Sequence, residues 1–209
     1  MGLGRFLREW RELFRFRALP AESRCIVFYA EDEASWKHFQ PIISELGEGF
    51  GKRVCYITSS VDDPVLKSSS DFIDAFYIGY GSARTTLFLS LKVGLMVMTM
   101  PDLATYNIKR SKYPVHYVYV FHSIVSSHMV YRHKAFDSFD SILCVGPHHV
   151  EEIRATESLY GLNPKQLIHS GYGLLDSIVD SNKKEADFRS SSAIKRVLIA
   201  PSWGKDALL

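Results

Sequence analysis

The chain has 209 residues, of which 46% are hydrophobic and 13% aromatic, enough for one large domain or one domain and part of another. Its formal net charge of +2 gives no global signal for a nucleic-acid partner. Three cysteines without C-x-x-C spacing argue against a disulfide framework and a cysteine zinc site, and no apolar run reaches the ~18 residues that span a bilayer. We therefore expect a cytoplasmic protein, with Cys25, Cys55 and Cys144 in buried strands.

Residues 2–17 are predicted to form an amphipathic helix. Six apolar residues recur at helical spacing on one arc of about 120°. They are Leu3, Phe6, Leu7, Trp10, Leu13 and Phe14, and the rest of the surface carries Arg5, Arg8, Arg11 and Arg15. Such a helix either docks on its own domain or lies on an anionic membrane surface, and its composition suits both.

Strands and helices are expected to alternate after residue 23. Strands are predicted at 25–30, 53–58, 72–78, 95–100, 115–121, 141–145 and 166–169, and helices at 33–46, 82–92, 148–160 and 174–180. Near-continuous apolar strands between helices of this length are typical of an α/β fold: a Rossmann-like parallel sheet with helices on both faces.

The predicted organisation has three parts. Residues 1–19 form the amphipathic helix, and residues 20–190 form the Rossmann-like domain. Residues 191–209 would be a linker and the first strand of a second, truncated domain, because a polar patch at 181–192 precedes a new apolar strand at 196–200. We therefore expect the amino-terminal half of a two-domain protein.

His122 is the first candidate for chemistry. It follows the Val- and Tyr-rich run 115–121, and open parallel sheets bind their ligands beyond the carboxyl ends of the strands. An imidazole titrates near neutral pH and can take a proton from a hydroxyl group, which predicts a general base.

The segment Gly79-Tyr80-Gly81 is part of a dinucleotide fingerprint, but Arg84 occupies the place of its third glycine. A helix start capped by Ser82, with Arg84 in its first turn, would suit a phosphate group. The alternative is a plain tight turn with a capping serine.

Other polar groups follow His122 in the chain. The spacing of His122, His128 and His133 matches no compact zinc pattern, so we predict no metal. The residues expected to contact a phosphate group, or the substrate whose hydroxyl gives up its proton (the acceptor), are Gly79, Gly81, Ser82, Arg84, Ser123, His128 and Arg132. Arg132, with Tyr131 and Lys134, could equally form a solvated face.

Three segments resemble the CDP-glycerol glycerophosphotransferase family, the teichoic-acid primases and polymerases. Residues 121–123 (Phe-His-Ser) are similar to its Trp-His-Gly segment, and residues 171–176 to its Gly-Tyr-Pro-Arg-Asn-Asp segment. Residues 197–203, ending in Ala-Pro-Ser-Trp, are similar to its Leu-Tyr-Ala-Pro-Thr-Trp segment. Ser123 departs from the family's glycine, and residues 173–175 lack its proline, arginine and asparagine.

The resemblance implies a GT-B fold and transfer of glycerol phosphate from CDP-glycerol, the donor substrate, to an acceptor hydroxyl. It implies His122 as general base and no cofactor. It implies a nucleotide-activated donor, a polyol-phosphate or lipid-linked acceptor, and a peripheral position on the inner face of the cell membrane through residues 2–17. The family's second catalytic histidine and nucleotide pocket belong to the second domain, so we expect the 209 residues alone to be inactive. The alternatives are a nucleotide-sugar glycosyltransferase, an enzyme similar to UDP-N-acetylglucosamine 2-epimerase, or a non-catalytic docking domain.

Overall fold

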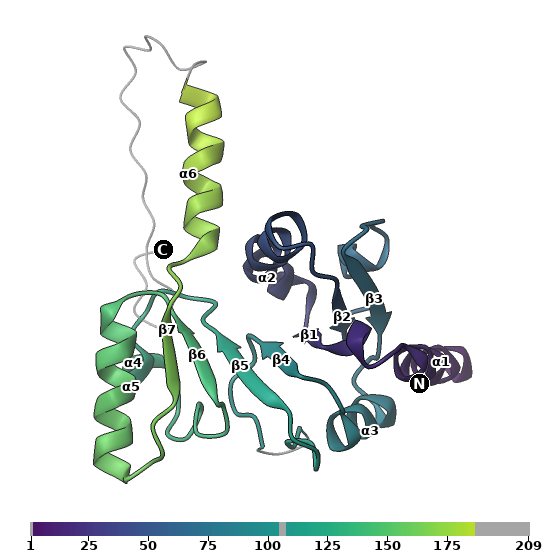
Figure 1. Ribbon diagram of the computed structural model, residues 1–209, viewed down its shortest axis with the longest axis horizontal. Coiled ribbons are helices and arrows are strands. Elements are labelled where there is room, and N and C mark those ends of the chain that lie inside the picture. Colours follow the sequence, from purple (N-terminus) through teal and green to yellow (C-terminus); the bar gives the residue numbers. More distant parts are fainter. Residues whose placement is uncertain (1, 105–107, 187–209) are drawn as a thin grey trace, which may run out of the picture. The chain divides into compact units, whose positions relative to one another are not determined.

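The fold is organised around one parallel sheet of seven strands (Figure 1). This computed structural model describes residues 2–104 and 108–186, in two units that divide after Leu174. The strands are β1 Ile26–Ala30, β2 Val54–Thr58, β3 Ile73–Tyr77, β4 Leu95–Met98, β5 His116–Val120, β6 Ser141–Cys144 and β7 Gln166–His169. They lie in the order β3-β2-β1-β4-β5-β6-β7, and each pair is parallel. This confirms the predicted Rossmann-like α/β class.

Helices cover both faces of the sheet, as expected. The helices are α1 Leu3–Ala18, α2 Trp36–Ser44, α3 Ser82–Ser90, α4 Ser127–Val130, α5 Pro147–Tyr160 and α6 Gly173–Ala186. Side chains alternate along β1, so Val27 and Tyr29 join the core formed with α1, α3 and α5, whereas Phe28 packs with Phe39 of α2 on the other face. A strand buried on both faces requires apolar residues at every position, which explains its unbroken apolar run.

Several boundaries differ from the prediction. The helix expected at 33–46 divides into a 3-10 turn (Glu33–Ser35), α2, and a π-helical turn (Glu45–Gly49). α6 continues to Ala186, so the first part of the polar patch at 181–192 is helical rather than irregular. Cys25 precedes β1 and is exposed, so its expected place in a buried strand is wrong, whereas Cys55 and Cys144 are buried. The strand and domain start expected within 191–209 lie outside the described residues.

α1 confirms the predicted helix, but the sheet contacts a different face of it. Its buried residues are Glu9, Glu12, Leu13 and Phe16. Phe16 packs edge-on against Phe76 of β3, and the Arg5 Nε–H donates to the Tyr77 hydroxyl over 2.8 Å. Most of the expected apolar arc therefore faces solvent. Within the described part of the chain, no helix combines the length and apolarity needed to cross a membrane.

Candidate functional site

The strand order places a ligand-binding crevice at one point of the sheet. From β1 the chain first adds β2 and β3 on one side, and then crosses over to add β4 to β7 on the other. The loops after β1 and β4 consequently run in opposite directions and leave a crevice between them. In open α/β sheets this crevice, beyond the carboxyl ends of the strands, is where ligands bind.

A cavity of about 590 Å³ lies at this crevice. Its walls come from the loops after β1, β4 and β5, from the start of α2 and from the segment after α4. The polar side chains that line it are Glu31, Asp32, Ser35, Lys37, His38, Thr99, Asp102, His122, Tyr131 and Arg132. The lining combines two imidazoles, two cations and three carboxylates, which suits a polar ligand better than an apolar one.

The backbone fixes which nitrogen of His122 is available. Nδ1 lies 3.2 Å from the Thr99 carbonyl oxygen, an atom that can only accept a hydrogen bond, so Nδ1 carries the proton. The Tyr119 hydroxyl lies 3.4 Å from the same nitrogen. Within residues 2–104 and 108–186 no hydrogen-bond partner is present at Nε2. The unprotonated nitrogen is therefore the one available to a ligand.

The surroundings of His122 also keep its ring neutral. Partial burial lowers the pKa of His122, and Lys37 acts in the same direction, while the bond to Thr99 and the charge of Asp32 oppose the shift. Burial dominates, so the pKa lies below the ordinary value of 6.5. At neutral pH the ring is uncharged and can accept a proton, which is what a general base requires.

α5 holds the loop that follows His122. The buried His149 ring stacks on Phe121 at 3.7 Å, its Nε2 lies 2.9 Å from the Val125 carbonyl oxygen, and its Nδ1 accepts from the Val145 N–H. The Glu152 carboxylate accepts both the N–H and the hydroxyl of Ser127 at 2.6 Å. Because both ends of the loop are fixed, His122 is held on a rigid support rather than on a free loop.

A second imidazole, His38 of α2, lines the same cavity. Its ring centre lies 6.1 Å from that of His122, and 5.9 Å from the ring of Tyr172. The Tyr172 hydroxyl donates to the backbone oxygen of His122 over 3.1 Å. His38 is not among the residues predicted from the sequence, where the one signal for it is its place in the first helix after β1, at the crevice.

Arg132 lines the same cavity. Its Nε–H donates to the Asp102 carboxylate over 2.5 Å, and the Asp102 N–H donates to the Ala135 oxygen over 2.8 Å. These bonds join the loop after β4 to the segment after α4. Asp102 has a φ of 66°, a left-handed conformation that costs energy in a residue with a side chain and is held here by these contacts.

The predicted glycine-rich phosphate site does not lie in this cavity. Gly79, Gly81 and Ser82 follow β3, near the far edge of the sheet. Gly81 is the N-cap of α3 and Ser82 is its first helical residue, so the expected cap by Ser82 is wrong. Arg84 already contacts protein groups: it donates to the Tyr29 hydroxyl over 3.3 Å and lies 3.9 Å from the Glu31 carboxylate.

A carboxylate occupies the space beside Gly79. Gly79 has a φ of 62°, and a Cβ atom added there would lie 2.1 Å from Oε1 of Glu9. Glu9 is only 1% exposed, and no hydrogen-bond partner of its Oε1 is found among the described residues. A negative group packed on this turn disfavours a phosphate, so the plain-turn alternative describes it better.

We expect Glu9→Gln to stabilise the protein at pH 7. Burial raises the pKa of Glu9, although Arg5 and the Tyr77 hydroxyl oppose this. The folded state thus favours the protonated acid, and stability present below the unfolded-state pKa of about 4.3 is lost as the pH rises through the folded-state value. Urea denaturation should show a gain of about 1 kcal/mol at pH 7 that shrinks toward pH 4.

Glu12→Gln is the matched control, because Glu12 is also buried in α1 but pairs with Arg15 at 2.7 Å. Glu12→Gln should bring no gain in stability at pH 7. An equal gain from both variants would contradict the special position of Glu9.

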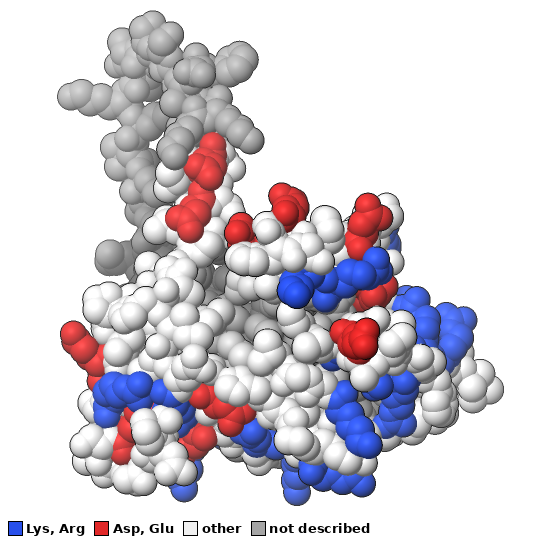
Figure 2. All heavy atoms as spheres, in the orientation of Figure 1, with Lys and Arg blue, Asp and Glu red and all other residues white. Residues whose placement is uncertain are grey.

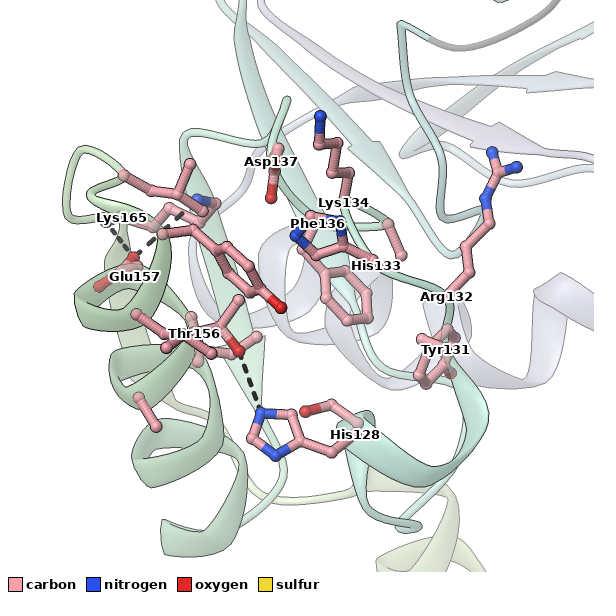
Figure 3. Close-up of a pocket in the computed structure, with 17 residues that line it drawn as sticks. His128, Tyr131, Arg132, His133, Lys134, Phe136, Asp137, Thr156, Glu157 and Lys165 are labelled. Carbon is pink, nitrogen blue, oxygen red and sulfur yellow. Dashed lines mark hydrogen bonds and ion pairs between the residues drawn. The ribbon is translucent and has the colours of Figure 1, made fainter.

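Ser123 and His128 do not line the cavity with His122. Ser123 is partly exposed, and His128 points away to α5, where its Nε2 lies 3.0 Å from both the Glu152 oxygen and the Thr156 hydroxyl. Figure 3 shows His128 and Thr156 in a second pocket, between α5 and the segment after α4. Its volume is about 320 Å³, and Tyr131 and Arg132 line both this pocket and the cavity of His122. Of the seven residues predicted to contact acceptor or phosphate, only Arg132 therefore lines the cavity together with His122.

The described residues contain no group of three or more His, Cys, Asp or Glu side chains arranged to hold a metal ion.

Comparison of the chain with protein-family models, with curated proteins and with solved structures finds no match. The geometry of the cavity and the residues around His122 therefore carry the functional argument.

Proposed function

We propose that this chain is the acceptor-side half of a GT-B transferase that moves glycerol phosphate from CDP-glycerol to an acceptor hydroxyl, as in teichoic-acid or capsule biosynthesis. One observation carries the proposal. His122 lies in the cavity at the crevice between the loops after β1 and β4. Its Nδ1 is bonded to a backbone carbonyl, and its Nε2 is available to a ligand. The choice of CDP-glycerol as donor rests on the resemblance of residues 121–123 and 171–176 to that family.

In the proposed reaction Nε2 of His122 takes the proton of the acceptor hydroxyl. The acceptor oxygen forms a bond to the phosphorus that carries the glycerol, the bond from that phosphorus to CMP breaks, and CMP leaves. Lys37 would offset charge on the phosphates, while Arg132, which also lines the cavity, is paired with Asp102. The nucleotide would be bound by a second domain.

The products distinguish this proposal from its alternatives. The intact protein should be incubated with CDP-glycerol and a polyol-phosphate acceptor, and separately with UDP-sugars, and the released nucleotide quantified. CMP supports glycerophosphate transfer. UDP would point instead to a glycosyltransferase or an epimerase-like enzyme, and release of neither would favour a docking domain.

We also propose that α1 places the protein on an anionic membrane surface. Its outward face combines apolar and cationic groups: Leu3, Leu7 and Phe14 are 74%, 58% and 59% exposed, and both acidic residues of the helix are buried. All exposed charged residues of α1 are therefore arginines. Figure 2 shows Lys and Arg side chains gathered over the end of this unit where α1 lies. Arginines beside exposed aromatic and leucine side chains complement anionic lipid headgroups above an apolar layer.

Co-sedimentation with vesicles tests this surface. The protein should bind vesicles that contain phosphatidylglycerol and should bind pure phosphatidylcholine weakly, and salt should reduce binding. The double variant Leu7→Gln/Phe14→Gln should weaken binding by a factor of about 10 or more, because two apolar side chains no longer enter the lipid. Arg11→Glu should weaken it by a factor of about 5 or more.

Leu89→Gln and Arg53→Glu are the matched controls, since both side chains are exposed but lie outside α1. They should bind like the unchanged protein. Binding that ignores lipid charge, or equal losses in the control variants, would contradict a membrane role for α1.

A further inference from the structure

We infer that His38 is a second ligand-contacting residue of the cavity, which holds the acceptor hydroxyl against His122. This inference rests on the proposed function and adds a residue to it. His38 comes from α2, whereas His122 follows the end of β5, and both line the cavity. The two rings are 6.1 Å apart at their centres and 65° apart in their planes.

The separation of the rings suits a single oxygen atom between them. A hydroxyl oxygen accepts or donates at about 2.8–3.0 Å, so it can join two nitrogens that are up to about 6 Å apart. Rings whose centres lie 6.1 Å apart allow one pair of their nitrogens to come within that span. Tyr172 fixes this arrangement, because its ring contacts His38 and its hydroxyl bonds to the backbone of His122.

One ring nitrogen of His38 lacks a hydrogen-bond partner among the described residues. This atom, Nδ1, is buried. Buried polar atoms in proteins nearly always have a partner, and an exception is explained by strain, by a catalytic role or by an ordered water or ion. The neighbouring Ser35 and Thr99 hydroxyls bond to each other over 3.3 Å, and neither is a partner of His38 Nδ1.

The charges around the cavity assign different roles to the two rings. Burial, Lys37 and the neighbouring His122 lower the pKa of His38 to about 4, and Asp32 only partly opposes them. His38 therefore stays neutral when His122 takes a proton, since a second positive charge beside the first is disfavoured. A neutral imidazole can orient a hydroxyl group without competing for its proton.

The alternative is that His38 only forms a wall of the cavity, and His38→Phe separates the two roles because it keeps a ring but removes both nitrogens. The test uses the 209-residue chain with ¹⁵N-labelled histidines and sn-glycerol 3-phosphate as the probe. Both the His38 and His122 nitrogen signals should shift on titration. His38→Phe should weaken binding by a factor of about 10, and His38→Gln, which keeps a hydrogen-bonding group, by less than about 3.

The possible outcomes separate the two proposals. If the His122 signal responds in the unchanged chain while the His38 signal does not, or if His38→Phe binds as well as the unchanged chain, His38 is a wall and the inference fails, whereas the proposed function stands. If neither signal responds, the cavity does not bind a phosphorylated polyol, and the proposed function fails together with the inference. Because the first readout uses the unchanged chain, it does not depend on the folding of a variant.

Discussion

Replacing His122 by Asn should lower the rate of CMP release from CDP-glycerol by the intact protein by a factor of about 10²–10⁴, the usual contribution of a general base. The asparagine amide can replace Nδ1 as donor to the Thr99 oxygen, so the loop keeps its support. Only Nε2, the nitrogen that would accept the proton, is lost. The effect should appear in kcat at saturating acceptor.

His128→Ala is the control within the same segment. His128 is an exposed histidine that contacts α5 and lines the other pocket, so its loss should change the rate by less than about threefold. If transfer by the His122→Asn protein were unchanged, His122 would serve packing or docking, and the proposed mechanism would be wrong.

The pH dependence of transfer gives a second readout of the same group. A general base works when it is unprotonated, and partial burial lowers the pKa of His122 below 6.5. The acid limb of the kcat/KM profile should therefore have its midpoint below 6.5 in the unchanged protein, and this limb should vanish in His122→Asn.

The sheet and its helices could be predicted because local sequence determines them. The run at 115–121 consists mainly of Val and Tyr, which favour strands, and Pro147 lies at the start of α5, where its missing N–H is tolerated. The position of His122 beyond a strand end followed from the same pattern. Element ends depend less on local sequence, as the extension of α6 into the polar patch at 181–192 shows.

The remaining features depend on contacts between distant parts of the chain. His38 and His122 are 84 positions apart, and nothing local indicates that α2 faces the end of β5. The face of α1 that is buried is another example. Hydrophobicity favoured burial of Leu3 and Leu7, but contacts of Phe16 and Arg5 with β3 determine the docked face and bury Glu9.

Glu157→Ala should destabilise the fold by about 3–5 kcal/mol, the usual cost of removing one partner from a buried charged network. Glu157 lies near the end of α5, is 6% exposed, and accepts the Lys165 N–H over 2.7 Å and the Arg154 guanidinium. The Lys165 ammonium group, also buried, lies 4.0 Å from the same carboxylate. The carboxylate therefore joins the end of α5 to the residue that precedes β7.

Alanine at this position would leave a buried N–H and a buried ammonium group without their acceptor, and both costs add. Glu157→Gln keeps an acceptor for the Lys165 N–H but removes the charge, so its loss should be intermediate. Asp74→Ala is the matched control, because it breaks the exposed pair with Arg53 and should cost less than about 1 kcal/mol. Urea denaturation of the three variants should give this order, and equal losses for Glu157→Ala and Asp74→Ala would show that the network does not support β7.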